Sequence, residues 1–269
     1  MDSLTNNTQR LTEHFQNDRK TIGAYPEDLR VALSSLDTQE ALNEIKSWKG
    51  YKPTQLHSLH RFAKEIGVQD IFYKDESTRF DLGSFKALGG AYGVLKFIQN
   101  QLTKDLNKNI SIRDIRDGQY LDLTKNYTVV TATDGNHGRS VAYGAKLSGC
   151  KCQIYIHAEV SKGRQHAMEE FGAMVIRIRG NYDESLRICI EEAIKNNWQI
   201  ISDTSYEGYT KYPRYIMAGY TVLAHEITEQ LDYENLPTHI FLQAGVGGFA
   251  AAIMAYFWEK YAEKNIKFI

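Results

Sequence analysis

Lys86 lies at the predicted start of a helix, a position that can make a lysine reactive. Lys86 lies in the segment SFKALGG, two residues after Ser84, and serine is a favoured N-cap of helices. We therefore predict a helix that Ser84 opens, with Lys86 about two residues inside it. The partial positive charge at a helix N-terminus disfavours an ammonium group, so this lysine is easier to keep neutral and nucleophilic. Such a lysine can attach covalently to a carbonyl cofactor, whereas the alternative is a solvated surface side chain.

A second segment, TATDGNHG at 131–138, lies between a predicted strand and a predicted helix. Free backbone N–H groups and the helix dipole favour an anion there, such as a carboxylate. Asn136 can donate a hydrogen bond, and Gly135 and Gly138 permit close approach. The alternative is a simple cap on a turn between strand and helix. Asp134 is evidence against that alternative, because a carboxylate in a turn that binds anions implies an additional function.

The third segment, AGVGGFA at 244–250, is a glycine turn between an apolar strand and an apolar helix. Backbone N–H groups in such a turn can cradle a phosphate. Gly245, Gly247 and Ala250 also fit the dinucleotide-binding fingerprint, so a nicotinamide enzyme is an alternative. That fingerprint normally opens the first unit of its fold, however, and here it closes the last. The acidic ribose ligand expected about 20 residues later would also fall at or beyond the end of the chain.

Asp203 is a fourth candidate, because it ends the predicted strand WQIISDT. Ligands of open α/β sheets bind outside the carboxyl ends of the strands, so this aspartate points toward the predicted site. A lone aspartate is otherwise a common turn or cap residue.

The elements that must position these residues alternate regularly. Strands TVVTAT, CQIYIHA, MVIRIRG and WQIISDT are separated by the helical segments HGRSVAYGAKLSG, KGRQHAMEEFG and DESLRICIEEAIKNN, and THIFLQA with FAAAIMAYFWEKYAEK adds another unit. Repeated strand–helix units predict an α/β fold, with a parallel sheet covered by helices on both faces. The final residues, IKFI, are typical of the start of a buried strand, and no covering helix follows.

The remaining segments are predicted more simply. A helix is expected near Asp37–Trp48, with Thr38 to Glu40 as its polar first turn, and a strand is expected from Ile71 in IFYKDES. Residues 102–126 are highly polar and are expected to be a solvated connection.

Composition excludes several classes of protein. The 269 residues are 42 % hydrophobic, which permits a sizeable core, and 32 basic against 33 acidic residues give no basic excess for nucleic acid. The three cysteines, Cys150, Cys152 and Cys189, form no zinc pattern and are expected to be reduced thiols of a cytoplasmic protein. The N-terminal residues lack a secretory signal, and the longest apolar run, 249–258, is far short of the ~20 residues that span a bilayer. We therefore expect no metal, nucleic acid or membrane partner.

In order along the chain, SFKALGG, TDGNHG, SDTSYEGY and AGVGG resemble the motifs of fold-type II pyridoxal phosphate enzymes, the tryptophan synthase β-like superfamily that includes threonine dehydratase. Within that superfamily, the chain is most similar to the diaminopropionate ammonia-lyase family. The resemblance begins near Tyr51, in YKPTQL, and runs to the end of the chain. It implies a three-layer αβα, two-domain protein: a large domain from 1–88 and 207–269, incomplete at its C-terminus, and a small domain from 89–206.

The resemblance also implies roles for individual residues. Lys86 would hold pyridoxal 5′-phosphate covalently, Asn136 would bind its phenolic oxygen, and Gly245, Val246, Gly247 and Gly248 would hold its phosphate. The turn formed by Thr133, Asp134, Gly135 and His137 would take the carboxylate of a small amino acid. Related enzymes that act on hydroxyamino acids usually carry serine at the position of Asp134. This aspartate and Asp203 therefore favour a diamino acid, because both carboxylates suit a substrate with a second ammonium group.

The implied reaction is elimination of ammonia from 2,3-diaminopropionate, which ends in pyruvate and ammonia. Lys86 would be the base on the L-substrate face and Asp134 the base on the D-substrate face, while Asp203 would hold an amino group. Family members continue for roughly another hundred residues, so the resemblance implies a truncated chain and, at full length, a homodimer. A serine or threonine dehydratase and a truncated, inactive remnant that only binds are the alternatives.

Overall fold

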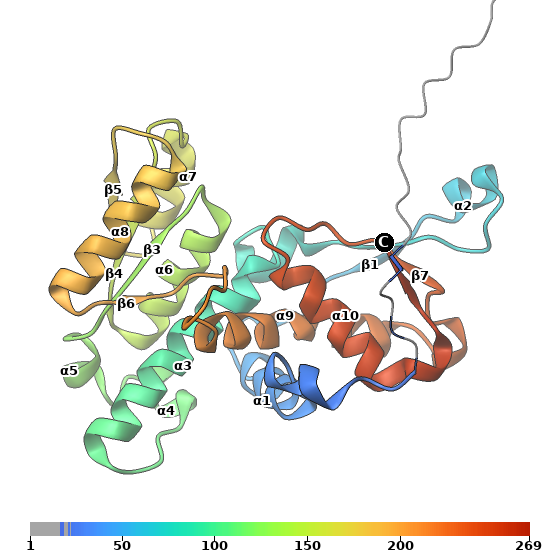
Figure 1. The fold of residues 1–269 in the computed structure, drawn as a ribbon, viewed down its shortest axis with the longest axis horizontal. Coiled ribbons are helices and arrows are strands. Elements are labelled where there is room, and N and C mark those ends of the chain that lie inside the picture. Colours follow the sequence, from blue (N-terminus) through green and yellow to red (C-terminus); the bar gives the residue numbers. More distant parts are fainter. Residues whose placement is uncertain (1–16, 19–20, 22) are drawn as a thin grey trace, which may run out of the picture.

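Four parallel strands form the central sheet of the computed structural model, which describes residues 17–18, 21 and 23–269 (Figure 1). Their order is β5-β4-β3-β6, and the strands are β3 (Thr128–Ala132), β4 (Lys151–Ile156), β5 (Met174–Arg177) and β6 (Gln199–Ile200). The connecting helices are α6 (Asn136–Ser148), α7 (Lys162–Glu169) and α8 (Tyr182–Asn196). The alternation predicted from the sequence, and the parallel sheet that follows from it, are confirmed.

Both faces of this sheet are covered, because successive side chains of a strand point to opposite sides. Val129 and Ile154 belong to the main core, which includes buried residues of α6 and of α3 (Lys86–Leu106). Val130 and Tyr155 pack instead in a smaller cluster with Cys189 of α8. Helices α6 and α8 therefore lie on opposite faces, which makes this part of the chain a three-layer αβα structure. The sheet lies within the predicted small domain, 89–206, and the domain division itself stays a prediction.

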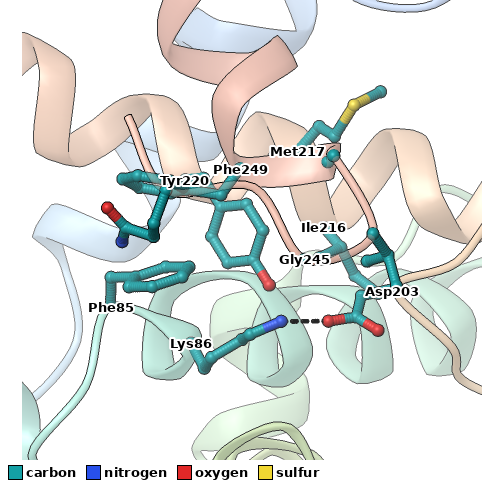
Figure 2. Close-up of a pocket in the computed structure, with 12 residues that line it drawn as sticks. Phe85, Lys86, Asp203, Ile216, Met217, Tyr220, Gly245 and Phe249 are labelled. Carbon is teal, nitrogen blue, oxygen red and sulfur yellow. Dashed lines mark hydrogen bonds and ion pairs between the residues drawn. The ribbon is translucent and has the colours of Figure 1, made fainter. Parts of the chain in front are cut away.

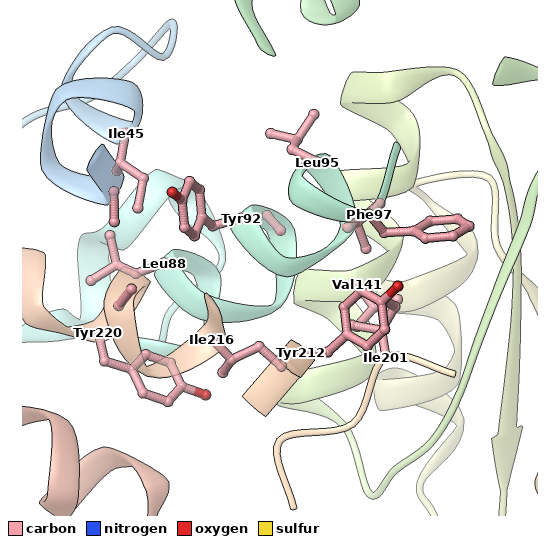
Figure 3. Packing of buried hydrophobic residues seen from close by; sticks show 14 of the residues in the cluster. Ile45, Leu88, Tyr92, Leu95, Phe97, Val141, Ile201, Tyr212, Ile216 and Tyr220 are labelled. Carbon is pink, nitrogen blue, oxygen red and sulfur yellow. The ribbon is translucent and has the colours of Figure 1, made fainter. Parts of the chain in front are cut away.

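Helix α3 joins the sheet region to the rest of the molecule through unusually close helix packing (Figures 1 and 3). Its partners are α6 and α9 (Lys211–Gln230). A Cβ atom on Gly144 of α6 would lie 2.7 Å from the Cα of Ala91, and one on Gly219 of α9 would lie 2.4 Å from the backbone oxygen of Leu88. Glycine at these two positions lets the three helix backbones approach each other, which fixes where α3 begins relative to α9.

The N-terminal helix differs slightly from its prediction. Helix α1 spans Ser35–Lys46, and it begins with a capping box in which Ser34 and Asp37 bond to each other's backbone N–H. The predicted first turn at Thr38 to Glu40 is therefore wrong, because the reciprocal cap starts the helix earlier. The carboxylate of Asp37 also accepts hydrogen bonds from Arg214, which ties α1 to α9.

Residues 102–126 are not the solvated connection that their polarity predicts. They contain the end of α3 and two short helices, α4 (Ile112–Arg116) and α5 (Leu121–Thr124). Ile110, Ile112 and Ile115 are buried in the main core. The prediction was wrong because a few isoleucines, spaced among many charged residues, anchor the segment while the charges stay in water.

Two small sheets complete the structure. Strands β1 (Leu56–Ser58) and β2 (Phe72–Lys74) pair in antiparallel fashion around α2 (His60–Ile66), and β7 (His239–Ile240) pairs in parallel with β8 (Lys267–Phe268). The final residues do form a strand, but Lys267 and Ile269 are exposed, so it is not the buried strand expected. The other elements are α10 (Gly248–Tyr261) and four short 3-10 helices, Glu27–Val31, Glu76–Asp81, Tyr233–Asn235 and Ala262–Lys264.

Candidate functional site

A cavity of about 200 Å³ lies where the beginnings of α3 and α10 face α9 (Figure 2). Segments that are far apart in the sequence line it: Phe85, Lys86, Asp203, Ile216, Met217, Tyr220, Gln243, Gly245, Val246, Gly247, Gly248 and Phe249. Three of the four segments singled out by the sequence thus contribute to one cavity. The cavity is largely apolar, with a few polar groups directed inward, as is typical of small-molecule sites.

Lys86 is the first residue of α3, one residue nearer the N-terminus of the helix than predicted. Ser84 does not occupy the N-cap position, which falls to Phe85, but its hydroxyl accepts a hydrogen bond from the backbone N–H of Lys86 at 3.1 Å. The preceding loop is strained, since Phe80 and Asp81 both have left-handed φ values, +49° and +59°. The loop therefore turns sharply into the helix and brings Lys86 to the cavity wall.

The ammonium group of Lys86 forms an ion pair with the carboxylate of Asp203, as Figure 2 shows. His137 approaches the same oxygen of this carboxylate, with its Nδ1 atom 3.8 Å from Oδ2 of Asp203. Burial raises the pKa of the Asp203 carboxyl, but His137 and Lys86 outweigh it, and the net pKa is below the usual value. Asp203 is therefore an ionised carboxylate, which can bind a positively charged group.

Asp203 and His137 meet because of the strand order. Strands β3 and β6 are parallel neighbours, so the loops after their carboxyl ends lie at the same edge of the sheet. The imidazole of His137 donates from Nε2 to the backbone oxygen of Ile201 at 2.8 Å, which ties the two loops together. Tyr209 fixes the second loop: its hydroxyl donates to the oxygen of Ile200 and accepts from the N–H of Ser202, both at 2.9 Å.

The glycine turn forms the wall opposite Lys86. Gly247 has a φ of +86° and precedes α10, whose first turn carries no side-chain cap. The first N–H groups of a helix lack partners within it, so they can bind an anion at this end of the cavity. A Cβ atom at Gly245 or Gly247 would meet nothing within 4 Å, so these positions open onto free space. The turn fits a phosphate group placed across the cavity from Lys86.

The TDGNHG turn lies outside this cavity, apart from the contact of His137 with Asp203. Thr133 is buried, and its hydroxyl accepts hydrogen bonds from the N–H groups of Gly135 and Gly138. Asn136 is exposed at the first position of α6. The structure therefore brings Lys86, Asp203 and the glycine turn together, and leaves the 133–136 part of the turn beside them rather than in the cavity wall.

Asp134 is not among the residues that line the cavity. Its side chain is 61 % exposed and pairs with His157, whose Nε2 lies 3.1 Å from Oδ1 of Asp134. The N–H of Glu159 donates to Nδ1 of the same ring at 3.3 Å, so Nε2 is the nitrogen that carries the hydrogen toward Asp134. Sequence reasoning did not identify this contact.

Helix α9 supplies cavity residues that the sequence analysis missed. Ile216, Met217 and Tyr220 all come from it, and Phe249 packs against Phe85 with ring centroids 4.1 Å apart. The signal was present in the spacing of Ile216, Tyr220, Leu223 and Ile227, which repeats every three or four residues as on one face of a helix.

A buried network of charges supports the segment that leads to Lys86. The guanidinium of Arg79 donates to both oxygens of Glu226, at 2.6 and 2.7 Å, and both side chains are 1 % exposed. Lys74 donates to the same carboxylate at 2.8 Å, and so do the hydroxyl of Tyr51, at 3.0 Å, and the N–H of Thr54, at 3.1 Å. This network holds residues 51–79 against α9, the helix that contributes Ile216, Met217 and Tyr220 to the cavity wall.

The part of the chain that the structure describes contains neither a membrane-spanning helix nor a cluster of metal-ligating side chains. Among the described residues, no helix is long and apolar enough to cross a membrane. No group of three or more metal-ligating side chains lies together in that same part of the chain.

Comparison with known proteins places this geometry in context. Residues 48–269 match the family model described as pyridoxal-phosphate dependent enzyme. The chain is 40 % identical over 254 residues to diaminopropionate ammonia-lyase of Salmonella typhimurium, which covers 93 % of this chain and 61 % of that protein. It is 38 % identical over 218 residues to the Escherichia coli protein of the same name, covering 81 % and 54 %. The chain thus spans less than two thirds of the length of these relatives.

Solved structures agree with the sequence comparison. The apo form of Escherichia coli diaminopropionate ammonia lyase superposes with a TM-score of 0.78 at 36 % identity, over 87 % of this chain and 63 % of that one. The same enzyme in complex with D-serine gives a TM-score of 0.80 at 35 % identity, over 88 % and 60 %.

Proposed function

This chain belongs to the pyridoxal-phosphate dependent enzyme family, and we propose that it binds pyridoxal 5′-phosphate through Lys86 and eliminates ammonia from 2,3-diaminopropionate. The observation that carries the proposal is the ion pair of Lys86 and Asp203 in a cavity whose opposite wall is the glycine turn. The first relatives bear the name of this activity, and the chain spans only part of their length.

The cavity residues fit the cofactor. A lysine at one wall suits its aldehyde, and the uncapped start of α10 with Gly245, Val246, Gly247 and Gly248 suits its phosphate. A side chain in place of Gly247 would be strained by the positive φ. When bound, the cofactor draws electron density from the α-carbon of an amino acid, which makes the α-proton removable.

The chain's own residues would perform the remaining steps. Lys86 would hold the cofactor and, once the substrate amine takes its place, accept the α-proton from the L-substrate. The β-amine then leaves as ammonia, and water releases the second amine as ammonia to give pyruvate. Asp134 would accept the proton from the D-substrate, and Asn136 would donate to the cofactor. In the present geometry these two side chains are exposed, so both roles require the TDGNHG turn to close over the substrate.

Asp203 supports a diamino acid over a hydroxyamino acid. Its carboxylate binds an ammonium group in this structure, that of Lys86, and it has a lowered pKa. The second ammonium of 2,3-diaminopropionate can replace that of Lys86 once the lysine is engaged elsewhere. The hydroxyl of serine or threonine carries no charge and would satisfy this buried carboxylate less well.

Cofactor attachment is tested by mixing the purified chain with pyridoxal 5′-phosphate, recording its visible absorbance, reducing it with borohydride and mapping the modified peptide. We expect one modified lysine, Lys86, and loss of the modification in Lys86→Ala. The matched control is Lys162→Ala, which removes an exposed lysine at the start of α7 and should change nothing. Modification of Lys86→Ala to the wild-type extent would reject Lys86 as the attachment site.

Substrate choice is tested by pyruvate release from each enantiomer of 2,3-diaminopropionate and of serine. A preference for serine over both diamino acids would move the assignment to a dehydratase.

The sequence also led us to propose a cytoplasmic location and a homodimeric assembly of the full-length enzyme. Analytical ultracentrifugation of a full-length protein tests the second proposal, and a monomer at micromolar concentration would contradict it.

A further inference from the structure

Tyr220 presents a buried hydroxyl that has no hydrogen-bond partner among residues 17–18, 21 and 23–269. The residue is 1 % exposed and lines the cavity, and Figure 2 shows its hydroxyl directed toward Lys86 and Asp203. Buried polar groups in folded proteins are nearly always paired. An unpaired hydroxyl at a cavity wall therefore indicates a partner that occupies the cavity.

The ring of Tyr220 is held firmly in place. It makes edge-to-face contacts with Phe85, at a centroid distance of 5.2 Å, and with Phe249, at 6.0 Å. On its third side it lies against α3 at Gly89, where a Cβ atom would be only 2.4 Å from Cε1 of the ring. The hydroxyl therefore cannot swing away to find a partner elsewhere, so its direction is set by packing.

The ring of Tyr220 lies close to Lys86. The ammonium nitrogen of Lys86 is 5.9 Å from the centroid of the Tyr220 ring. Burial, and then the charge of Asp203, raise the pKa of the Tyr220 hydroxyl well above its usual value, so it stays neutral. A neutral hydroxyl can donate one hydrogen bond and accept others, which suits a ligand with both kinds of group.

We propose that Tyr220 is a cofactor-binding residue, whose hydroxyl forms a hydrogen bond with the end of pyridoxal 5′-phosphate that is attached to Lys86. The proposal rests on the proposed function and adds a residue that no motif in the sequence marks. Phenylalanine would make the same aromatic contacts as Tyr220, so Tyr220→Phe removes only the hydroxyl. This single substitution therefore distinguishes a structural role of Tyr220 from a ligand-binding role.

Tyr220→Phe is the test, with Tyr256→Phe as its matched control. The hydroxyl of Tyr256 lies in α10, outside the cavity, and is bonded to His225 at 3.1 Å, to Thr228 at 3.3 Å and to Lys260 at 3.3 Å. Without cofactor, Tyr220→Phe should unfold at the same temperature as the wild type or higher, because it removes an unpaired buried hydroxyl. Tyr256→Phe should unfold at a lower temperature, because it removes the hydrogen bonds that this hydroxyl makes with its side-chain partners.

Cofactor binding gives the second readout. Titration with pyridoxal 5′-phosphate should show binding about two- to twelvefold weaker in Tyr220→Phe, the range that one net hydrogen bond supplies, and unchanged in Tyr256→Phe. Equal affinity in Tyr220→Phe and the wild type would overturn the inference while leaving the proposed function intact. So would a fall in thermal stability without a fall in affinity. If the wild-type chain does not bind the cofactor at all, the proposed function and this inference both fail.

Discussion

Glu226→Gln should destabilise this protein more than almost any other change of one charge. In the wild type, the carboxylate of Glu226 accepts from Arg79 through both oxygens and from Lys74 at 2.8 Å. Glutamine has nearly the same shape, but it carries no charge and has only one acceptor oxygen. The substitution therefore removes the carboxylate that Arg79 and Lys74 share and turns an N–H₂ group toward one of them, whereas the ion pair of Arg79 with Glu76, at 2.7 Å, remains.

The expected size follows from the burial of the pair. Both Arg79 and Glu226 are 1 % exposed, and breaking a buried ion pair from one side costs about 3–5 kcal/mol, of which the lower end, about 3 kcal/mol, applies here because Arg79 keeps the carboxylate of Glu76. Domains are stable by only about 5–15 kcal/mol, so the loss is a large part of the total. At roughly 2–4 °C per kcal/mol for chains of this size, the unfolding temperature should fall by about 6–12 °C.

Glu184→Gln is the matched control, because it removes the same chemical group from an exposed ion pair with Arg187. It should have no measurable effect, since exposed pairs contribute little. Urea unfolding at neutral pH, followed by circular dichroism, measures both variants. If Glu226→Gln and Glu184→Gln unfold at the same urea concentration, the network does not stabilise the fold in the way argued here.

The same carboxylate predicts a pH dependence. Burial raises the pKa of Glu226, but hydrogen bonds and charges from Arg79 and Lys74 outweigh it, so the net pKa lies below the ordinary 4.5. A carboxyl group whose pKa is lower in the folded state stabilises the protein above that ordinary value, and the contribution is lost as the pH falls through the folded-state pKa. Glu226→Gln should therefore lose less stability than the wild type between neutral pH and about pH 3. Parallel stability curves over that range would contradict this.

Two further substitutions test the site and its supporting helices. Asp134→Asn should reduce pyruvate release from D-diaminopropionate by about 10²–10⁴-fold and spare more of the L-reaction, because only the D-substrate would need this base. Equal loss on both enantiomers would reject the two-base arrangement, and no loss would leave Asp134 only its ion pair with His157. Gly89→Ala should destabilise the fold by about 1–3 kcal/mol, since its Cβ would lie 2.4 Å from the ring of Tyr220, whereas Gly163→Ala, which meets nothing within 4 Å in α7, should stabilise it slightly. Urea midpoints compare the pair, and a stabilising Gly89→Ala would show that Tyr220 is free to move.

The match to the pyridoxal-phosphate dependent family does not support the nicotinamide enzyme suggested by Gly245, Gly247 and Ala250. The glycine turn is shared by both classes, because any phosphate bound at a helix N-terminus needs close backbone approach. What distinguishes them is a lysine facing that turn, and Lys86 occupies that position.

The sequence by itself determined the elements and most of their order. Glycines at 245–248, the strand–helix alternation from Thr128 onward and the polar residues at strand ends are local signals, because caps, turns and periodicity act over a few residues. They also predicted that Lys86, the TDGNHG turn, Asp203 and the glycine turn would share a cleft, since all four fall at the ends of predicted elements. The TDGNHG turn does not line the cavity. Local signals failed where a few apolar residues decided burial, as Ile112 and Ile115 did among their charged neighbours.

Only the tertiary structure decided which side chains face each other. Tyr220 enters the cavity because Gly89 and Gly219 let α9 approach α3, and no pattern in the sequence predicts that approach. Asp134 belongs to the motif but faces His157, a residue of the next loop, because the direction of a side chain depends on neighbours from distant parts of the chain. Spacing along the sequence specifies helices and turns, whereas the contacts that make a site reactive arise only when those elements pack.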